Sequence, residues 1–194
     1  MTQARLVLAS SSPYRRALLD RLGVTFATFT PDIDESALPG ETAQQQVRRL
    51  AEAKAAAGSE AFGGALIIGS DQVAVCREDV LGKPGSHERA RRQLARLAGQ
   101  RVSFLTGLCL YDTSTGRARI DMVPYHVRFR ALTEAQIERY LRAEQPYNCA
   151  GSFKSEGLGI SLFESMEGED PSALIGLPLI RLVTWLNEAG VKVP

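Results

Sequence analysis

The sequence has few of the features that mark a metal-scaffolded, secreted or membrane-spanning protein. It has three cysteines and no Cys-x-x-Cys pair, which argues against a zinc knuckle and against a disulfide framework. Its two histidines, His87 and His126, have no partners at metal-ligand spacing. No apolar run approaches the roughly 18 residues of a membrane span, so no membrane association is expected. The N-terminus lacks a signal-peptide pattern, so we expect no export and a cytoplasmic location.

Net charge is also nearly absent. Lys and Arg number 23 against 22 Asp and Glu, so no global field attracts nucleic acid, and stable nucleic-acid binding is not expected. There is no internal repeat, low-complexity segment or linker. We therefore expect one domain over residues 1–194, in which any smaller lobe is an insertion within about 85–145.

The most informative stretch begins at residue 6. Residues 6–9 are apolar and predict a buried strand, residues 10–12 are serines in a loop, and Pro13 suits the first turn of a helix with Ser12 as its N-cap. Such a turn aims backbone N–H groups and the positive end of the helix dipole at one point, which suits an anion. With Arg15 nearby, phosphate is the expected ligand, although an ordinary strand–helix turn would have the same pattern.

The next candidate residues lie on a loop and a helix. Residues 32–35 hold three carboxylates, which are solvated in most loops but would suit Mg²⁺, because hard cations prefer carboxylate oxygens. Thr42 and Gln45 have capping-box spacing and predict a helix to about Ala57. Lys54 falls on the apolar stripe of this helix, where a lysine either snorkels to solvent or points into a cleft.

A central strand is predicted over residues 65–73, because its apolar run is continuous until Asp71. A carboxylate there must be paired, bound to a metal, or face a cleft at the carboxyl end of the strand. Strand alternation sends Asp71 and Gln72 to opposite faces, so we expect them to have different roles.

The rest of the chain alternates helices and strands. Helices are predicted over 87–98, after Thr133 and from residue 179 to Gly190, and paired strands over 102–112 and 120–130. Pro84 restricts Lys83 to an extended conformation, which fixes the direction of its side chain. Residues 148–159 form a long, glycine-punctuated loop of a kind that tends to be functional.

The chain resembles the Maf family over nearly its whole length. The matching segments, in order, are Leu8-Ala9-Ser10-Ser11-Ser12-Pro13-Tyr14-Arg15-Arg16, Asp34-Glu35, Lys54, Ser70-Asp71-Gln72-Val73, Gly82-Lys83-Pro84, Thr106-Gly107, Ala150-Gly151-Ser152-Phe153 and Gly176-Leu177-Pro178. Maf proteins are nucleoside triphosphate pyrophosphatases. The resemblance implies an α/β fold like that of inosine triphosphatases, a mixed twisted sheet with flanking helices and two lobes around a cleft. It also implies a divalent cation, Mg²⁺ or Mn²⁺, and allows a homodimer.

Three positions distinguish the chain from members that act on dTTP and UTP. It has Tyr14 in place of arginine, Gln72 in place of threonine and Glu156 in place of glutamine, and so is similar to the subgroup that hydrolyses 7-methyl-GTP. Methylated guanine carries a positive charge, which an aromatic face such as that of Tyr14 attracts by about 0.5–2 kcal/mol. Glu156 could accept hydrogen bonds from the N–H edge of the base.

The resemblance implies attack of water on the α-phosphorus, with release of 7-methyl-GMP and pyrophosphate. Asp71 would be the proton acceptor, and Glu35 the cation ligand with Asp71 as candidate co-ligand; the sequence does not decide between these roles for Asp71. The residues expected to bind the phosphates are Ser10, Ser12, Arg15, Lys54 and Lys83.

Such an enzyme would remove modified nucleotides before they enter nucleic acid. Two alternatives stay open at this point. One is a Maf pyrophosphatase for other ordinary or damaged nucleotides, and the other is a non-enzymatic regulator of cell division.

Overall fold

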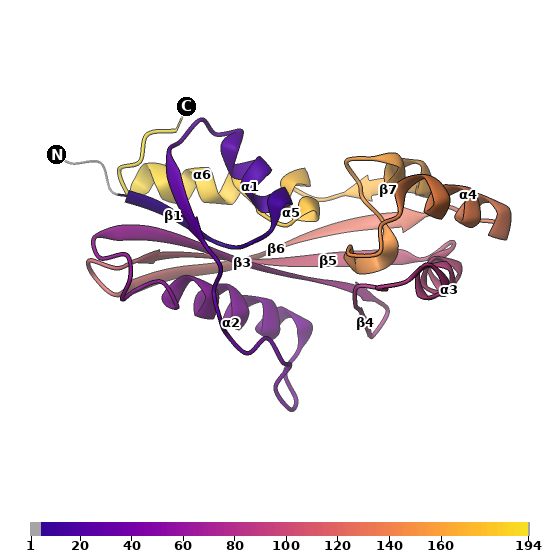
Figure 1. The fold of residues 1–194 in the computed structure, drawn as a ribbon, viewed down its shortest axis with the longest axis horizontal. Helices are drawn as coiled ribbons and strands as arrows, with labels where there is room; N and C mark the ends of the chain where they lie inside the picture. Colours follow the sequence, from indigo (N-terminus) through magenta and orange to yellow (C-terminus); the bar gives the residue numbers. More distant parts are fainter. Residues whose placement is uncertain (1–4, 194) are drawn as a thin grey trace. The chain divides into compact units, whose positions relative to one another are not determined.

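The computed structural model describes residues 5–193 and has the predicted α/β class (Figure 1). Its mixed sheet has the strand order β2-β1-β3-β5-β6-β7, with β4 paired to β3. The strands are β1 (Arg5–Ala9), β2 (Phe26–Phe29), β3 (Ala65–Cys76), β4 (Asp79–Leu81), β5 (Arg101–Asp112), β6 (Arg117–Phe129) and β7 (Phe163–Glu167). The helices are α1 (Pro13–Asp20), α2 (Ala43–Ala56), α3 (His87–Leu97), α4 (Glu134–Glu144), α5 (Pro171–Ile175) and α6 (Leu179–Glu188), with short 3₁₀ turns η1 (Ala150–Ser152) and η2 (Leu158–Leu162).

The chain divides into two compact units. Unit 1 contains the described residues up to Gln72, Thr106–Val123 and the residues from Asp170 onward, and unit 2 contains Val73–Leu105 and Pro124–Glu169. The long strands β3, β5 and β6 each contribute to both units. The single-domain organisation expected from the sequence stays a prediction.

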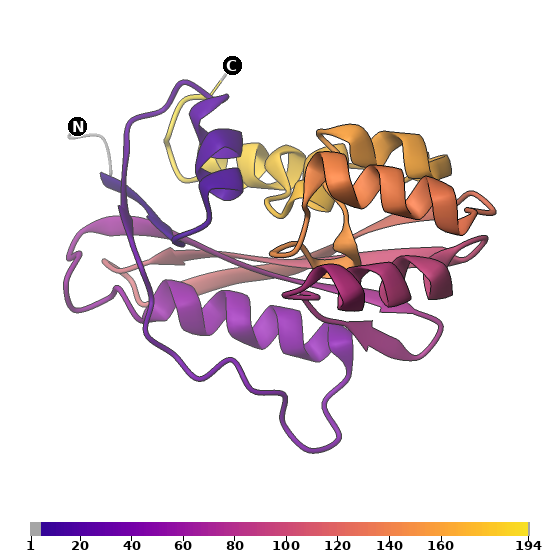
Figure 2. The same ribbon diagram turned by 45° about the vertical axis from the view of Figure 1, so that its right-hand side comes forward.

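In unit 1 the strands are covered on both faces, because successive side chains alternate between two cores. Leu6 and Leu8 pack with residues of α1 and α6, whereas Val7 and Ala9 pack with residues of α2. Figures 1 and 2 show α2 on one face of these strands and α1 and α6 on the other. The apolar runs at residues 6–9 of β1 and 65–68 of β3 follow from this double coverage.

Two glycines let α2 approach the sheet closely. A Cβ added at Gly69 of β3 would lie 2.0 Å from the carbonyl oxygen of Ala51, and one at Gly107 of β5 would lie 2.0 Å from that of Val47. Both carbonyls belong to α2, so any larger side chain at either glycine would push this helix away from the sheet. Lys54 follows Ala51 by three residues and lies on the same face of α2.

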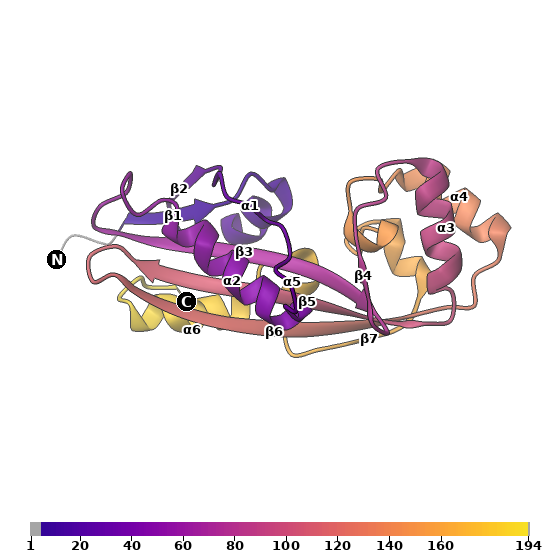
Figure 3. The same ribbon diagram turned by 90° about the horizontal axis from the view of Figure 1, so that it is seen from below.

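Unit 2 buries one face of its strands under α3 and α4, which pack against each other (Figure 3). Its core contains four phenylalanine rings, with centroids 4.8–5.7 Å apart in edge-to-face contact, an arrangement that aromatic rings favour. They are Phe104, Phe129, Phe153 and Phe163.

The helix starts agree with the sequence prediction. Ser12 and Thr42 cap α1 and α2 as expected, and Thr133 caps α4 with the same reciprocal box. The prediction missed α5 and β7, each of which has five residues. Within residues 5–193, no helix combines the length and the apolar character that crossing a membrane requires.

Candidate active site

The centre of the candidate site is a buried lysine between two carboxylates in unit 1. Lys54 Nζ lies 2.6 Å from Asp71 Oδ1 and 2.9 Å from Glu35 Oε1. Lys54 is 6% exposed and Asp71 7%, whereas the Glu35 side chain is 57% exposed. Lys54 therefore points inward to a charged partner and does not snorkel to solvent.

Asp71 and Gln72 face opposite sides of β3, as strand alternation predicted. Asp71 faces α2 and contacts Lys54, whereas the Gln72 amide nitrogen donates to Thr106 Oγ1 at 2.9 Å and to the carbonyl oxygen of Ala173 in α5 at 2.7 Å. The orientation of Gln72 is fixed by these bonds. Its role in specificity stays a prediction.

Arg15 supplies a second positive charge to the same cluster. Its Nε donates to the carbonyl oxygen of Gly176 at 2.8 Å. Burial lowers the pKa of Arg15, while the charges of Asp71 and Glu35 act in the opposite direction. Arg15 therefore lies within electrostatic reach of both carboxylates that contact Lys54.

The serine loop leaves the sheet beside this cluster. Ala9 at the end of β1 is paired with Gly69, so residues 10–12 follow at the edge where Ser70 and Asp71 lie. Ser10 Oγ accepts from the N–H of Ser12 at 3.1 Å, and Ser12 Oγ accepts from the N–H of Arg15 at 3.4 Å. The hydroxyl groups thus shape the turn through their acceptor oxygens. Tyr14, in the first turn of α1, is 38% exposed.

The segment that carries α5, Pro171–Ile175, contributes to the site although no sequence signal marked it as functional. The carbonyl oxygen of Gly176 accepts from both Arg15 and Ser70, and Asp170 caps α5 and also accepts from the N–H of Ile180 at 2.8 Å. Asp170 is 3% exposed. An Asp-Pro dipeptide is a helix-start signal, so Asp170-Pro171 could have revealed this helix.

The two remaining predicted site residues belong to unit 2. Lys83 is exposed beside the buried Pro84, between β4 and α3. Glu156 is exposed between η1 and η2, where its Oε2 accepts from Ser155 Oγ at 3.1 Å. The structure therefore brings Arg15, Lys54, Asp71 and Glu35 together in unit 1 and holds Lys83 and Glu156 in unit 2.

Comparison with protein-family models shows to which family the chain belongs. A family model described as "Maf-like protein" matches residues 5–189. The chain belongs to the Maf family. This Maf chain is 60% identical to a 7-methyl-GTP pyrophosphatase of Pseudomonas syringae pv. tomato, over 97% of its own length and 98% of the relative. It is 57% identical to a 7-methyl-GTP pyrophosphatase of Alcanivorax borkumensis, over 97% of its own length and 96% of the relative.

A solved structure supports the fold of this Maf chain. The HAM1 protein from Coxiella burnetii superposes with a TM-score of 0.53 at 16% identity, over 95% of this chain and 99% of that one. This likeness confirms the inosine-triphosphatase-like fold that the resemblance implied.

The Maf chain has two carboxylates that suit a divalent cation. Mg²⁺ is commonly held by one or two carboxylates together with substrate phosphates and water, and Glu35 and Asp71 share one ammonium group, so their oxygens converge on one point. Among residues 5–193, no group of three or more His, Cys, Asp or Glu side chains is placed to hold a metal ion. Two carboxylates alone would leave most ligand positions of such a cation to substrate and water.

Proposed function

We propose that this Maf protein is a nucleoside triphosphate pyrophosphatase that hydrolyses 7-methyl-GTP to 7-methyl-GMP and pyrophosphate. The observation that carries the proposal is the buried Lys54–Asp71 pair beside Glu35 and Arg15, at the edge where the serine loop begins. Relatives 55–60% identical to the chain bear the name 7-methyl-GTP pyrophosphatase, which supports this choice of reaction and substrate.

The charge arrangement suits a triphosphate. Its roughly four negative charges need cationic partners, and catalysis of phosphoryl transfer consists mostly of positioning and electrostatic stabilisation. Arg15 and Lys54 supply positive charge within unit 1, and Lys83 is the further phosphate-binding cation that the family resemblance implies. The residues Ser10 and Ser12 and the N-terminus of α1 complete the phosphate site.

Lys54 links substrate binding to the chemistry. In the free protein its single ammonium group forms an ion pair with both Asp71 and Glu35. A bound triphosphate competes for this ammonium and frees Asp71 Oδ1 to accept a proton from the water that attacks the α-phosphorus. Mg²⁺ or Mn²⁺, held by Glu35 and with Asp71 as candidate second ligand, would further neutralise the phosphates.

Base selection rests on Tyr14, Gln72 and Glu156. The Tyr14 ring offers an aromatic face to the positively charged base. Glu156 accepts hydrogen bonds from the N–H edge of guanine and offsets its charge. The bonds from Gln72 to Thr106 and α5 set the shape of the site on the opposite side of β3 from Asp71.

We also propose where the enzyme acts and on which form of nucleotide. It would act in the cytoplasm on a free nucleotide, without stable binding to nucleic acid, and would remove modified nucleotides before their incorporation. The family resemblance allows a homodimer.

The products of the reaction test the proposal. The full chain is incubated with 7-methyl-GTP and Mg²⁺ or Mn²⁺, and pyrophosphate and orthophosphate are measured separately. We expect pyrophosphate alone, a loss of at least about 100-fold in Asp71→Asn with nucleotide binding roughly intact, and full activity in Asp32→Asn, an exposed carboxylate on the Glu35 loop. Orthophosphate as the first product, or near-wild-type activity of Asp71→Asn, would contradict the proposal.

A further inference from the structure

Two loops of unit 2 carry residues to which the proposed function gives a role. Lys83 lies in the loop 82–85 that precedes α3, and Glu156 lies in the loop 150–157 that follows α4. The two loops are separated by more than sixty residues of chain, and one side chain of α3 contacts both of them.

That side chain is Gln93, which is half-buried. Its Nε2 donates to the carbonyl oxygen of Gly82 at 3.2 Å, next to Lys83. Its Oε1 accepts from Ser152 Oγ. A single amide therefore uses its N–H for one loop and its carbonyl oxygen for the other, and a side chain without both groups at this length cannot replace it.

The Ser152 end of this bridge is under conformational constraint. Ser152 is fully buried and has a φ of 62°, in the left-handed region that a residue with a Cβ rarely adopts. Gly151 before it also has a positive φ, of 76°. A hydrogen bond from the hydroxyl group is therefore well placed to hold this turn and the chain that leads to Glu156.

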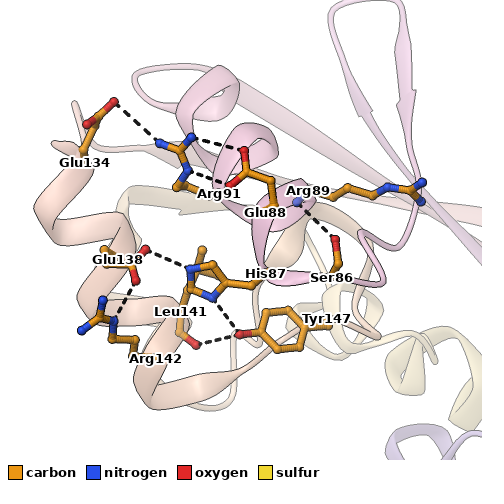
Figure 4. A network of polar contacts seen from close by, with 10 residues as sticks. All are labelled: Ser86, His87, Glu88, Arg89, Arg91, Glu134, Glu138, Leu141, Arg142 and Tyr147. Carbon is orange, nitrogen blue, oxygen red and sulfur yellow. Dashed lines mark hydrogen bonds and ion pairs between the residues drawn. The ribbon is translucent and has the colours of Figure 1, made fainter.

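The Lys83 loop has a second attachment that agrees with this arrangement. The N–H of Gly85 donates to the carbonyl oxygen of Tyr147 at 2.9 Å. The Tyr147 hydroxyl lies 3.0 Å from His87 Nδ1, and His87 Nε2 lies 2.9 Å from Glu138 of α4 (Figure 4). One end of the loop is thus bound to Tyr147, which follows α4, whereas Gln93 holds the end that contains Gly82.

We propose that Gln93 is a positioning residue that keeps the phosphate-binding Lys83 and the base-reading Glu156 in one fixed arrangement. This proposal rests on the proposed function. It gives Gln93 an indirect role, through the two loops that it holds. Because misplacement of a binding group weakens substrate binding before it alters chemistry elsewhere, Gln93 acts on KM and on base preference. The chemical step at Asp71, in unit 1, is unchanged.

The test compares Gln93→Leu, which retains the size of the side chain but neither donates nor accepts, with Arg92→Leu, an exposed position on the same helix. We expect Gln93→Leu to raise KM for 7-methyl-GTP about tenfold, to reduce the preference for 7-methyl-GTP over GTP, and to change kcat less than twofold. Arg92→Leu should match the wild type. An unchanged KM and base preference in a folded Gln93→Leu variant would overturn the proposal, and so would a loss confined to kcat.

Hydrogen exchange gives a readout that does not depend on activity. Gln93→Leu should accelerate amide exchange at least threefold in both 82–85 and 150–157, while α3 exchanges at the wild-type rate. Gln93→Glu retains an acceptor for Ser152 but loses the donor to Gly82, so only 82–85 should accelerate. Faster exchange throughout α3, or in neither loop, would refute the bridge. An inactive wild-type enzyme would instead contradict the proposed function, and the exchange result would still decide the role of Gln93.

Discussion

Replacing Lys54 should cost substantial stability, because it breaks the buried ion pair with Asp71. Lys54→Met keeps an unbranched chain of similar length but leaves Asp71, which is 7% exposed, without its cation. Removing one partner of a buried pair costs about 3–5 kcal/mol, because the remaining charge is desolvated and unpaired. Glu35 adds little to this loss, because its side chain is 57% exposed and solvated. We therefore expect the free energy of unfolding to fall by about 3 kcal/mol.

Urea unfolding followed by tryptophan fluorescence measures this loss directly. The single tryptophan, Trp185, lies on α6 and packs against the core of unit 1, so its emission reports the unit that contains the pair. A loss of 3 kcal/mol corresponds to a midpoint shift of about 1 M urea or more. Lys192→Met, at an exposed lysine, is the matched control and should unfold like the wild type.

A double variant separates the ion pair from side-chain packing. Asp71→Asn removes the charge that Lys54→Met leaves unpaired, so the double variant should lose at least about 1 kcal/mol less than the two single losses together. Additive losses, or a Lys54→Met variant as stable as Lys192→Met, would refute the account of a coupled buried pair.

Three further predictions follow from single residues. Glu156→Gln should reduce the kcat/KM ratio of 7-methyl-GTP to GTP several-fold while changing kcat little, because a neutral amide offsets less of the base charge; equal losses on both nucleotides would argue against it. Gly69→Ala should lower the free energy of unfolding in urea by about 1–3 kcal/mol, because the added Cβ meets the backbone of α2. Gly63→Ala, where an added Cβ has nothing within 4 Å, is the control and should unfold like the wild type. Equal urea midpoints for the two variants would contradict the close approach of α2 to the sheet. The hydrogen bond from Arg49 lowers the pKa of Glu41 to about 2 from 4.5, so its carboxylate stabilises the fold above pH 4.5 and loses this effect as the pH falls through about 2. The difference in urea midpoint between the wild type and Glu41→Gln should therefore become smaller as the pH falls through this interval. A difference that does not change with pH would contradict the stabilising role of the Glu41 carboxylate.

Local signals predicted much of the fold. Ser12 and Thr42 predict helix starts, because an N-cap side chain bonds to the backbone only three residues further along the sequence. The opposite directions of Asp71 and Gln72 follow from the two-residue period of a strand alone. Sequence motifs therefore singled out the charged residues that lie together in unit 1. These are Arg15, Glu35, Lys54 and Asp71.

Other features depend on contacts that no local pattern encodes. The partner of Lys54 is decided by how closely α2 approaches the sheet, which depends on Gly69 and Gly107. The carbonyl oxygen of Gly176, which accepts from Arg15, has no sequence signature because every residue has one. The five residues of α5 are too few to show helical periodicity, so only its Asp-Pro start could have revealed it.

The most direct test of the central claim compares kcat/KM for pyrophosphate release from 7-methyl-GTP, GTP, dTTP and UTP, side by side with Mg²⁺ or Mn²⁺. The account predicts pyrophosphate release with a clear preference for 7-methyl-GTP. A preference for dTTP or UTP would contradict the roles given to Tyr14 and Glu156, and no release from any of the four would contradict the proposed function itself.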